Sequence, residues 1–220
     1  MTTPRVFIDT AEIDEIKDAV STGLVDGVAT NPNKIALSCK TYRQVLDEIR
    51  QVFKGPIAFQ AMGNTTEEII RHALEIHGMD RLLAVKIVAN RIGLPAIKPL
   101  VAEGVRTNAT LMFNPSQALL AGLAGSPFIS PFIGRARMAG GDGIAEIAQM
   151  RKLLDAWGLD KTLIIGASIK DVAQVIDVIL AGAHCVAVPF AVFTAMMEHP
   201  LTEQGYEHFA AELAKVRSRG

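Results

Sequence analysis

The stretch "LLAVKIVAN", residues 82–90, places Lys86 in the middle of an apolar run. Apolar residues on both sides of the lysine indicate a strand that is buried on both faces. An ammonium group costs several kcal/mol in such a strand unless it is paired or neutral. Lys86 therefore either lies on an edge strand and extends to water, or is a buried amine with a lowered pKa that attacks a carbonyl group.

Seven other short apolar runs share this character, and helical patterns separate them. The runs are rich in Val, Ile and Phe and are mostly bounded by Gly, Pro, Asp or Asn, which is typical of strands. The eight predicted strands are residues 5–10, 26–31, 56–61, 82–87, 105–113, 127–135, 162–168 and 185–190. Between them apolar residues recur at helical spacing, for example at Val45, Leu46 and Ile49.

The alternation of strand and helix, repeated eight times without a linker, predicts an α/β fold: a (β/α)8 TIM barrel in which residues 1–220 form a single domain. An open doubly wound sheet is the alternative, but no G-x-G-x-x-G motif follows the first predicted strand. Helices cover the outside of a barrel, so an edge lysine would have a poor path to water. An inward side chain near the end of a barrel strand faces the active site instead, which favours Lys86 as a nucleophile.

The composition of the 220 residues narrows the function further. A formal net charge of -1 favours neither nucleic acid nor an anionic membrane as a partner. The histidines show no metal-ligand spacing, so we expect no metal site, and we expect no cofactor. No apolar run is long enough to span a bilayer, and the N-terminal residues do not resemble a signal peptide. We therefore expect a cytoplasmic protein.

Polar side chains gather where the predicted strands end. They are Asp9 and Thr10, Thr30 and Asn31, Gln60, Asn108 and Thr110, Ser130 and Arg135, and Ser168 with Lys170 just beyond. Each has a structural explanation of its own, since Asp9 or Thr30 could cap a helix and Asn31 could begin a turn. In a barrel, however, all of them would surround Lys86 on one face, and a common function explains that arrangement better.

Iminium chemistry matches these residue types. A lysine amine that adds to a ketone forms an iminium, an electron sink that lets the neighbouring C–C bond break or form. Asp9 is placed to take and return the proton of a sugar hydroxyl. Gln60 and Thr110 are suited to hold the water molecule that leaves when the iminium forms and returns when it is hydrolysed. Side chains suited to the substrate's hydroxyl groups are those of Thr30, Asn31, Asn108 and Ser130.

A guanidinium, a hydroxyl and an ammonium group occur together on the sixth and seventh predicted strands, at Arg135, Ser168 and Lys170. This combination matches a tetrahedral anion, because charged donors form the strongest hydrogen bonds to phosphate oxygens. The late strands are also where barrels commonly bind phosphate. The sequence therefore predicts a phosphate site at these three residues.

The chain resembles the small transaldolases and their relatives, the fructose-6-phosphate aldolases. The resemblance covers nearly the whole chain and rests on the motifs "FIDTAEIDEI", "GVATNPN", "AVKI", "LVAEGVRTNATLMFNPSQALLAGLAG", "ISPFIGR" and "GASIKDVAQVIDVILAGAHCVAVP". It implies a (β/α)8 barrel with Lys86 as Schiff-base nucleophile and Asp9 as acid and base. It also implies a phosphate site at Arg135 and Ser168, and dihydroxyacetone as the unit of the ketose that is held on the lysine.

The two branches of the family differ at a few positions, and this chain combines them. Asn108, Ser130 and Phe132 resemble the transaldolases, whereas Gln60 resembles the aldolases. We favour a transaldolase that transfers a dihydroxyacetone unit from a ketose phosphate to an aldehyde acceptor, as in the pentose phosphate pathway. The alternatives are a lyase that releases or uses free dihydroxyacetone, and a barrel that binds sugar phosphates without turnover.

The chain departs from both branches at four positions near these motifs. Val88 and Asn90 follow the lysine where the family usually has Pro and Thr, and Arg137 and Met138 replace a polar stretch after Arg135. A further arginine beside the predicted phosphate site suggests an unusual ketose as substrate, or another anion such as a sulfonate.

A ninth helix is predicted at about residues 202–218, beyond the eighth strand. An apolar stripe on it consists of Tyr206, Phe209, Leu213 and Val216. A closed barrel has little core left for this helix to join, so we expect it to contact another copy of the chain. The resemblance implies a homo-oligomer built from rings of five, a pentamer or a decamer. The alternative is a helix that packs on its own barrel.

Overall fold

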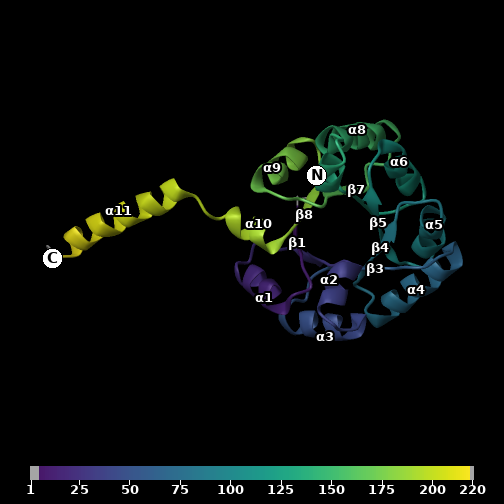
Figure 1. Ribbon diagram of the computed structural model, residues 1–220, viewed down its shortest axis with the longest axis horizontal. Coiled ribbons are helices and arrows are strands. Elements are labelled where there is room, and N and C mark those ends of the chain that lie inside the picture. The colour runs from purple at the N-terminus through teal and green to yellow at the C-terminus, as the bar shows by residue number, and fades with distance from the viewer. Residues whose placement is uncertain (1–4, 219–220) are drawn as a thin grey trace.

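A closed barrel of eight parallel strands, surrounded by helices, forms the centre of the computed structural model, which describes residues 5–218 (Figure 1). The strands are ordered around the barrel as they are along the chain, and β8 pairs with β1 to close the sheet. The predicted (β/α)8 fold is confirmed, and the open sheet is ruled out. Residues 1–4 and 219–220, which belong to the predicted domain, lie outside the described residues.

The strands and helices have the following bounds. The strands are β1 (Arg5–Asp9), β2 (Gly27–Ala29), β3 (Ile57–Gln60), β4 (Ala84–Val88), β5 (Arg106–Met112), β6 (Phe128–Pro131), β7 (Leu163–Gly166) and β8 (Cys185–Val188). The helices are α1 (Ile13–Ser21), α2 (Pro32–Leu37), α3 (Tyr42–Val52), α4 (Thr66–Met79), α5 (Leu94–Ala102), α6 (Pro115–Leu123), α7 (Ile133–Met138), α8 (Gly143–Ala156), α9 (Val172–Leu180), α10 (Phe190–Ala195) and α11 (Pro200–Arg217).

Strand β4 shows how the sequence divides between the two faces of the sheet. Side chains alternate along a strand, so Val85 and Ile87 point outward into the core between the sheet and the helices, where both are fully buried. Ala84 and Lys86 point inward and line a cavity inside the barrel. The strand within this apolar run therefore has one face in the core between sheet and helices and one face on the cavity.

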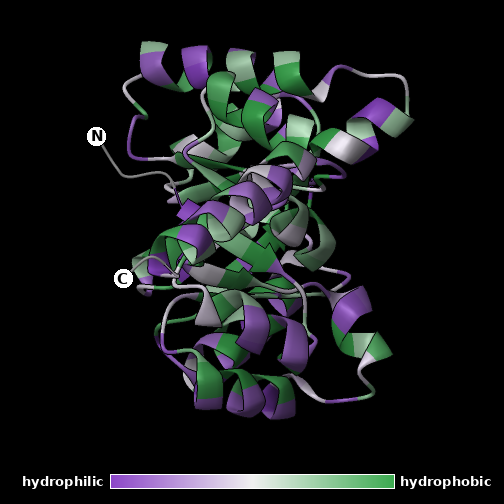
Figure 2. Cartoon of the chain, turned by 90° about the vertical axis from the view of Figure 1, so that its left-hand side faces the viewer, coloured by the Kyte–Doolittle hydropathy of each residue, from purple (hydrophilic) through white to green (hydrophobic). Residues whose placement is uncertain are grey.

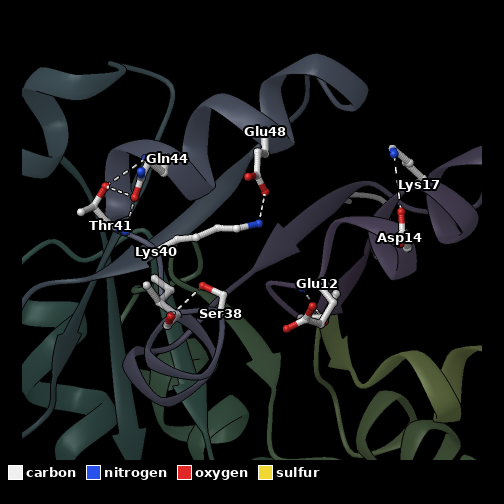
Figure 3. Close-up of polar contacts among 10 residues, drawn as sticks. Glu12, Asp14, Lys17, Ser38, Lys40, Thr41, Gln44 and Glu48 are labelled. Carbon is white, nitrogen blue, oxygen red and sulfur yellow. Dashed lines mark hydrogen bonds and ion pairs between the residues drawn. The ribbon is translucent and has the colours of Figure 1, made fainter.

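Helix α3 shows how local signals fix the surrounding helices. Its N-cap Thr41 accepts a hydrogen bond from the Gln44 backbone N–H at 3.3 Å, and Gln44 Oε1 accepts one from the Thr41 N–H at 2.9 Å (Figure 3). This reciprocal pair satisfies two N–H groups that the helix itself cannot. Hydrophilic and hydrophobic residues both occur along the helices around the barrel (Figure 2), as expected of helices with one face on the sheet. None of the helices in residues 5–218 is long and apolar enough to cross a membrane.

The sixth and seventh strands are shorter than predicted. The run 127–135 was expected to be one strand, but β6 ends at Pro131 and Arg135 lies on the short helix α7. Ser168 likewise follows β7 rather than ending it. Gly134, the second residue of α7, lies where a Cβ atom would be 2.0 Å from the carbonyl oxygen of Ser168. Only glycine permits this close approach of α7 to the segment after β7.

Helix α11 points away from the barrel (Figure 1). None of its described residues is buried, and Tyr206 and Phe209 on the predicted stripe are 71% and 72% exposed. The helix does not pack on its own barrel, so that alternative for residues 202–218 is wrong.

Candidate active site

A cavity of about 240 Å³ lies inside the barrel. Barrel interiors are usually filled by layers of bulky side chains. Here four of the inward positions carry only a methyl group, and they are Ala29, Ala58, Ala84 and Ala187. The small side chains leave room inside the barrel for a ligand.

Lys86 lies on the wall of this cavity, and its side chain is almost completely buried. Its Nζ donates a hydrogen bond to the carbonyl oxygen of Thr30 at 2.8 Å. Burial lowers the pKa of Lys86; the charge of Asp9 opposes this change, and the charge of Lys34 adds to it. A lysine in this environment has more of its amine in the neutral, nucleophilic form than a lysine in water.

Asp9, at the end of β1, is paired with Lys34 of helix α2. Lys34 Nζ lies 3.1 Å from Asp9 Oδ1 and also donates to the carbonyl oxygen of Asp9. Asn31 fixes the start of α2, because its Oδ1 accepts a hydrogen bond from the Lys34 backbone N–H at 3.1 Å. Side chains of a helix lean toward its N-terminus, so a long side chain in this first turn reaches back to the strand ends. Lys34 is a cavity residue that the sequence analysis missed, and its place in the first turn after Asn31 was the available signal.

Asn108 and Ser130 form a buried polar pair on the neighbouring strands β5 and β6. Ser130 Oγ donates to Asn108 Oδ1 at 2.9 Å. Asn108 is the register partner of Lys86, so its side chain points to the same face of the sheet. This leaves the Asn108 amide NH₂ group available as a donor beside the lysine.

The predicted phosphate site comes together from α7 and the segment after β7. Arg135, Ser168 and Lys170 all line the cavity. Ser168 has a φ of 60°, a left-handed backbone conformation that is uncommon outside glycine and often occurs at functional sites. The Arg135 guanidinium lies 5.5 Å from the centre of the Phe132 ring, which also lines the cavity. The attraction between a cation and an aromatic ring helps to hold the guanidinium in this position.

Nine of the twelve predicted site residues line the cavity, and three do not. Thr30 is fully buried: its hydroxyl donates to the carbonyl oxygen of Ala58 at 2.8 Å, and its own backbone carbonyl oxygen accepts the hydrogen bond from Lys86 Nζ. The Gln60 side-chain NH₂ contacts Met62 Sδ at 3.2 Å. The Thr110 hydroxyl is buried and has no hydrogen-bond partner among the described residues.

The departures from the family pattern lie away from the cavity wall. Arg137 lines a separate cavity with Asp142 and Asp177, not the one that holds Lys86. It therefore gives no support to the expectation of an unusual ketose, or of a sulfonate in place of phosphate, as the substrate. The Asn90 side chain has a structural role, because its Oδ1 accepts a hydrogen bond from the Gly93 N–H at 2.8 Å.

Polar side chains that meet at the C-terminal ends of the strands are the arrangement in which (β/α)8 barrel enzymes place their active sites. Within that class, the chain matches the family model described as transaldolase/fructose-6-phosphate aldolase over residues 6–219. The chain belongs to this family.

Curated relatives match this chain over nearly the full length of both sequences. Proteins named "Probable transaldolase" are 40% identical in Phenylobacterium zucineum, over 96% of this chain and 97% of the relative, and 39% identical in Moorella thermoacetica, over 98% and 100%. A protein of the same name in Clostridium perfringens is 38% identical over 96% and 98%.

A solved structure shares the fold without close sequence similarity. It is the thiamine phosphate pyrophosphorylase from Pyrococcus furiosus, with a TM-score of 0.57 and 15% identity, covering 86% of this chain and 87% of the other. At that identity the likeness concerns the barrel alone.

Proposed function

We propose that this protein is a transaldolase that transfers a dihydroxyacetone unit from a ketose phosphate to an aldehyde acceptor through a Schiff base on Lys86. The observation that carries the proposal is a buried lysine of lowered pKa on the wall of the cavity that also holds Asp9. Such an amine can attack a ketone, whereas an ordinary surface lysine is protonated.

The proposed reaction begins when the Lys86 amine adds to the C2 carbonyl of the donor and water leaves, which gives an iminium. Asp9 accepts the proton of the C4 hydroxyl, the C3–C4 bond breaks, and its electron pair moves into the iminium to form an enamine. The aldehyde fragment departs with the phosphate. The enamine carbon then attacks the acceptor aldehyde, Asp9 returns the proton to the new hydroxyl, and water releases the product ketose from Lys86.

The remaining cavity residues are assigned to substrate and water. Arg135, Ser168 and Lys170 would bind the phosphate group, since two cations and a hydroxyl match a tetrahedral dianion. The buried Thr110 hydroxyl, unpaired among the described residues, supports its proposed role with Gln60 in holding the water that is lost and regained, because buried hydroxyls normally have a partner.

Transfer rather than cleavage is proposed because of Phe132. Free dihydroxyacetone leaves only after the enamine is protonated and the iminium is hydrolysed, and the phenyl ring of Phe132 has no group that could assist either step. The enamine would then persist until an aldehyde arrives. Gln60, the aldolase-like residue, is an amide that cannot transfer a proton itself.

A product assay tests this assignment. With fructose 6-phosphate as donor, we expect slow release of dihydroxyacetone without an acceptor, much faster turnover with an aldehyde, and increased cleavage in Phe132→Tyr. Equal release with and without the aldehyde would replace the transferase by the lyase. A protein that binds the donor with no turnover under either condition would be the non-catalytic barrel.

Helix α11 supports a homo-oligomer, the pentamer or decamer that the family resemblance suggests. An 18-residue helix that buries none of its described residues gains no stability from packing. We propose that its stripe of Tyr206, Phe209, Leu213 and Val216 docks on a second copy of this chain. We also propose that residues 1–220 act as one domain, in the cytoplasm, in the interconversion of sugar phosphates.

A further inference from the structure

The cavity that holds Lys86 has a second charged end, at the N-terminal side of the barrel. Its lining includes Arg5 and Arg106, the first residues of β1 and β5, together with Phe128, the first residue of β6. These positions lie at the opposite ends of the strands from the candidate active site. The Arg106 guanidinium lies 5.8 Å from the centre of the Phe128 ring, so its planar face rests on an aromatic side chain.

The two arginines approach the cavity from opposite sides. Strands β1 and β5 are four positions apart in a closed barrel of eight, which places them across the barrel axis from each other. Both arginines line the same cavity, from strands on opposite sides of the barrel. A ligand on the barrel axis, near the first residues of β1 and β5, can be contacted by both arginines.

Within residues 5–218 neither guanidinium forms an ion pair or a side-chain hydrogen bond. The carboxylate of Asp26 accepts the Val6 backbone N–H at Oδ2 (3.0 Å), and among the described residues it forms no ion pair with either arginine. Asp26 is also absent from the cavity wall. Two cationic side chains without a protein counter-charge at one end of a cavity create a positive potential that attracts an anion.

We propose that the N-terminal end of the barrel is a second anion site, in which Arg5 and Arg106 bind a small oxyanion of the phosphate class. Guanidinium groups bind such oxyanions through paired hydrogen bonds, and arginine suits this geometry better than lysine. Guanidinium groups on opposite sides of the cavity can each bind two oxygens of one tetrahedral anion. The site is distinct from the predicted phosphate site at Arg135, and it does not depend on the proposed reaction.

The small residues of the barrel wall explain why an anion can enter here. Ala84 of β4 is the register partner of Arg106, and its methyl group leaves the space beside the guanidinium open. Arg5 is exposed, and Arg106 is partly exposed. The site is therefore open to solvent at its outer edge, and an ion can reach it without passing Lys86.

Phosphate binding can be measured by isothermal titration in a phosphate-free and sulfate-free buffer. The Arg135→Ala protein is the background, because it removes the phosphate contact predicted at the other end of the cavity. In this background we expect one bound phosphate. Adding Arg106→Gln or Arg5→Gln should weaken that binding at least about tenfold, which is the loss of a charge-assisted hydrogen bond.

The matched control is Arg71→Gln, which removes the same charge from the exposed surface of α4 and should leave phosphate binding unchanged. Glycerol phosphate in place of inorganic phosphate distinguishes a free ion from a phosphate ester as the preferred ligand. Circular dichroism and thermal melting confirm that each variant is folded, and the exposed Arg5 provides a second variant if Arg106→Gln does not fold. The inference is overturned if Arg135→Ala binds no phosphate, or binds it equally well with and without both Arg5 and Arg106.

Discussion

Lys34 Nζ lies 3.1 Å from Asp9 Oδ1, so the carboxylate predicted to handle the proton is ion-paired with a lysine other than Lys86. Lys34 lowers the pKa of Lys86 through its charge, whereas Asp9 raises it. The charge of Lys34 therefore favours the neutral amine of Lys86.

Replacement of Lys34 by methionine should shift the pH dependence of catalysis. The neutral amine is the reactive form, so the reaction should become faster as pH rises through the pKa of Lys86, which lies below the usual value of about 10.4. Without Lys34 that pKa rises, and the pH–rate profile moves to higher pH with a lower rate at neutral pH. The measurement is kcat/KM against pH for both proteins.

The matched control is Lys40→Met. Lys40 is also ion-paired, with Glu48 Oε2 at 2.6 Å, and this pair lies outside the cavity lining (Figure 3). Its loss should leave the pH profile in place. An unchanged profile in Lys34→Met would show that Lys34 has no influence on the ionisation of Lys86.

Arg135→Ala should raise KM for phosphorylated donors far more than for dihydroxyacetone. A charge-assisted contact to an anion contributes roughly 1.5–3 kcal/mol, which corresponds to a loss of roughly 10- to 150-fold in binding. The comparison of KM for the two donors separates anion binding from general damage. Equal losses for both donors would remove Arg135 from the phosphate site.

Gly134→Ala should destabilise the protein and weaken phosphate binding. A Cβ atom here would lie 2.0 Å from the carbonyl oxygen of Ser168, so the segment of Ser168 and Lys170 must move. We expect a loss of about 1–3 kcal/mol, typical of overpacking, measured by urea unfolding. The control is Gly78→Ala, a helical position with nothing within 4 Å of the new Cβ, where alanine should add about 0.5–1 kcal/mol of stability. A Gly134→Ala protein as stable as wild type, with unchanged KM, would contradict this account of the close approach between Gly134 and Ser168.

Phe209→Asp should dissociate the oligomer that we propose for α11. Phe209 lies on the apolar stripe and is 72% exposed in the single chain, so a charge there would be buried at the interface. The control is Ala211→Asp, which adds the same charge to the opposite face of the same helix. Light scattering at micromolar concentration should give an oligomer for wild type and Ala211→Asp and a smaller species for Phe209→Asp. A monomeric wild-type protein would refute the proposal.

Periodicity predicted the barrel because each strand and helix carries its own local signal, and parallel strands bring their C-terminal ends together. The same reasoning placed Asp9, Lys86 and Asn108 on one face. It missed Lys34: the first turn after Asn31 was a signal that a long side chain could reach back to the strand ends, but the contact with Asp9 also depends on how α2 lies against the sheet. It also made one strand of residues 127–135, because an apolar run does not show where a strand becomes a helix.

The central claim is that Lys86 forms the Schiff base, and borohydride trapping tests it most directly. Borohydride reduces an iminium to a stable amine, so dihydroxyacetone or fructose 6-phosphate should become covalently attached when the reductant is present. Peptide mass spectrometry should then find the adduct on Lys86 alone, and Lys86→Met should show neither adduct nor turnover. An adduct on Lys34 or Lys170 instead, or turnover that survives in Lys86→Met, would contradict the account.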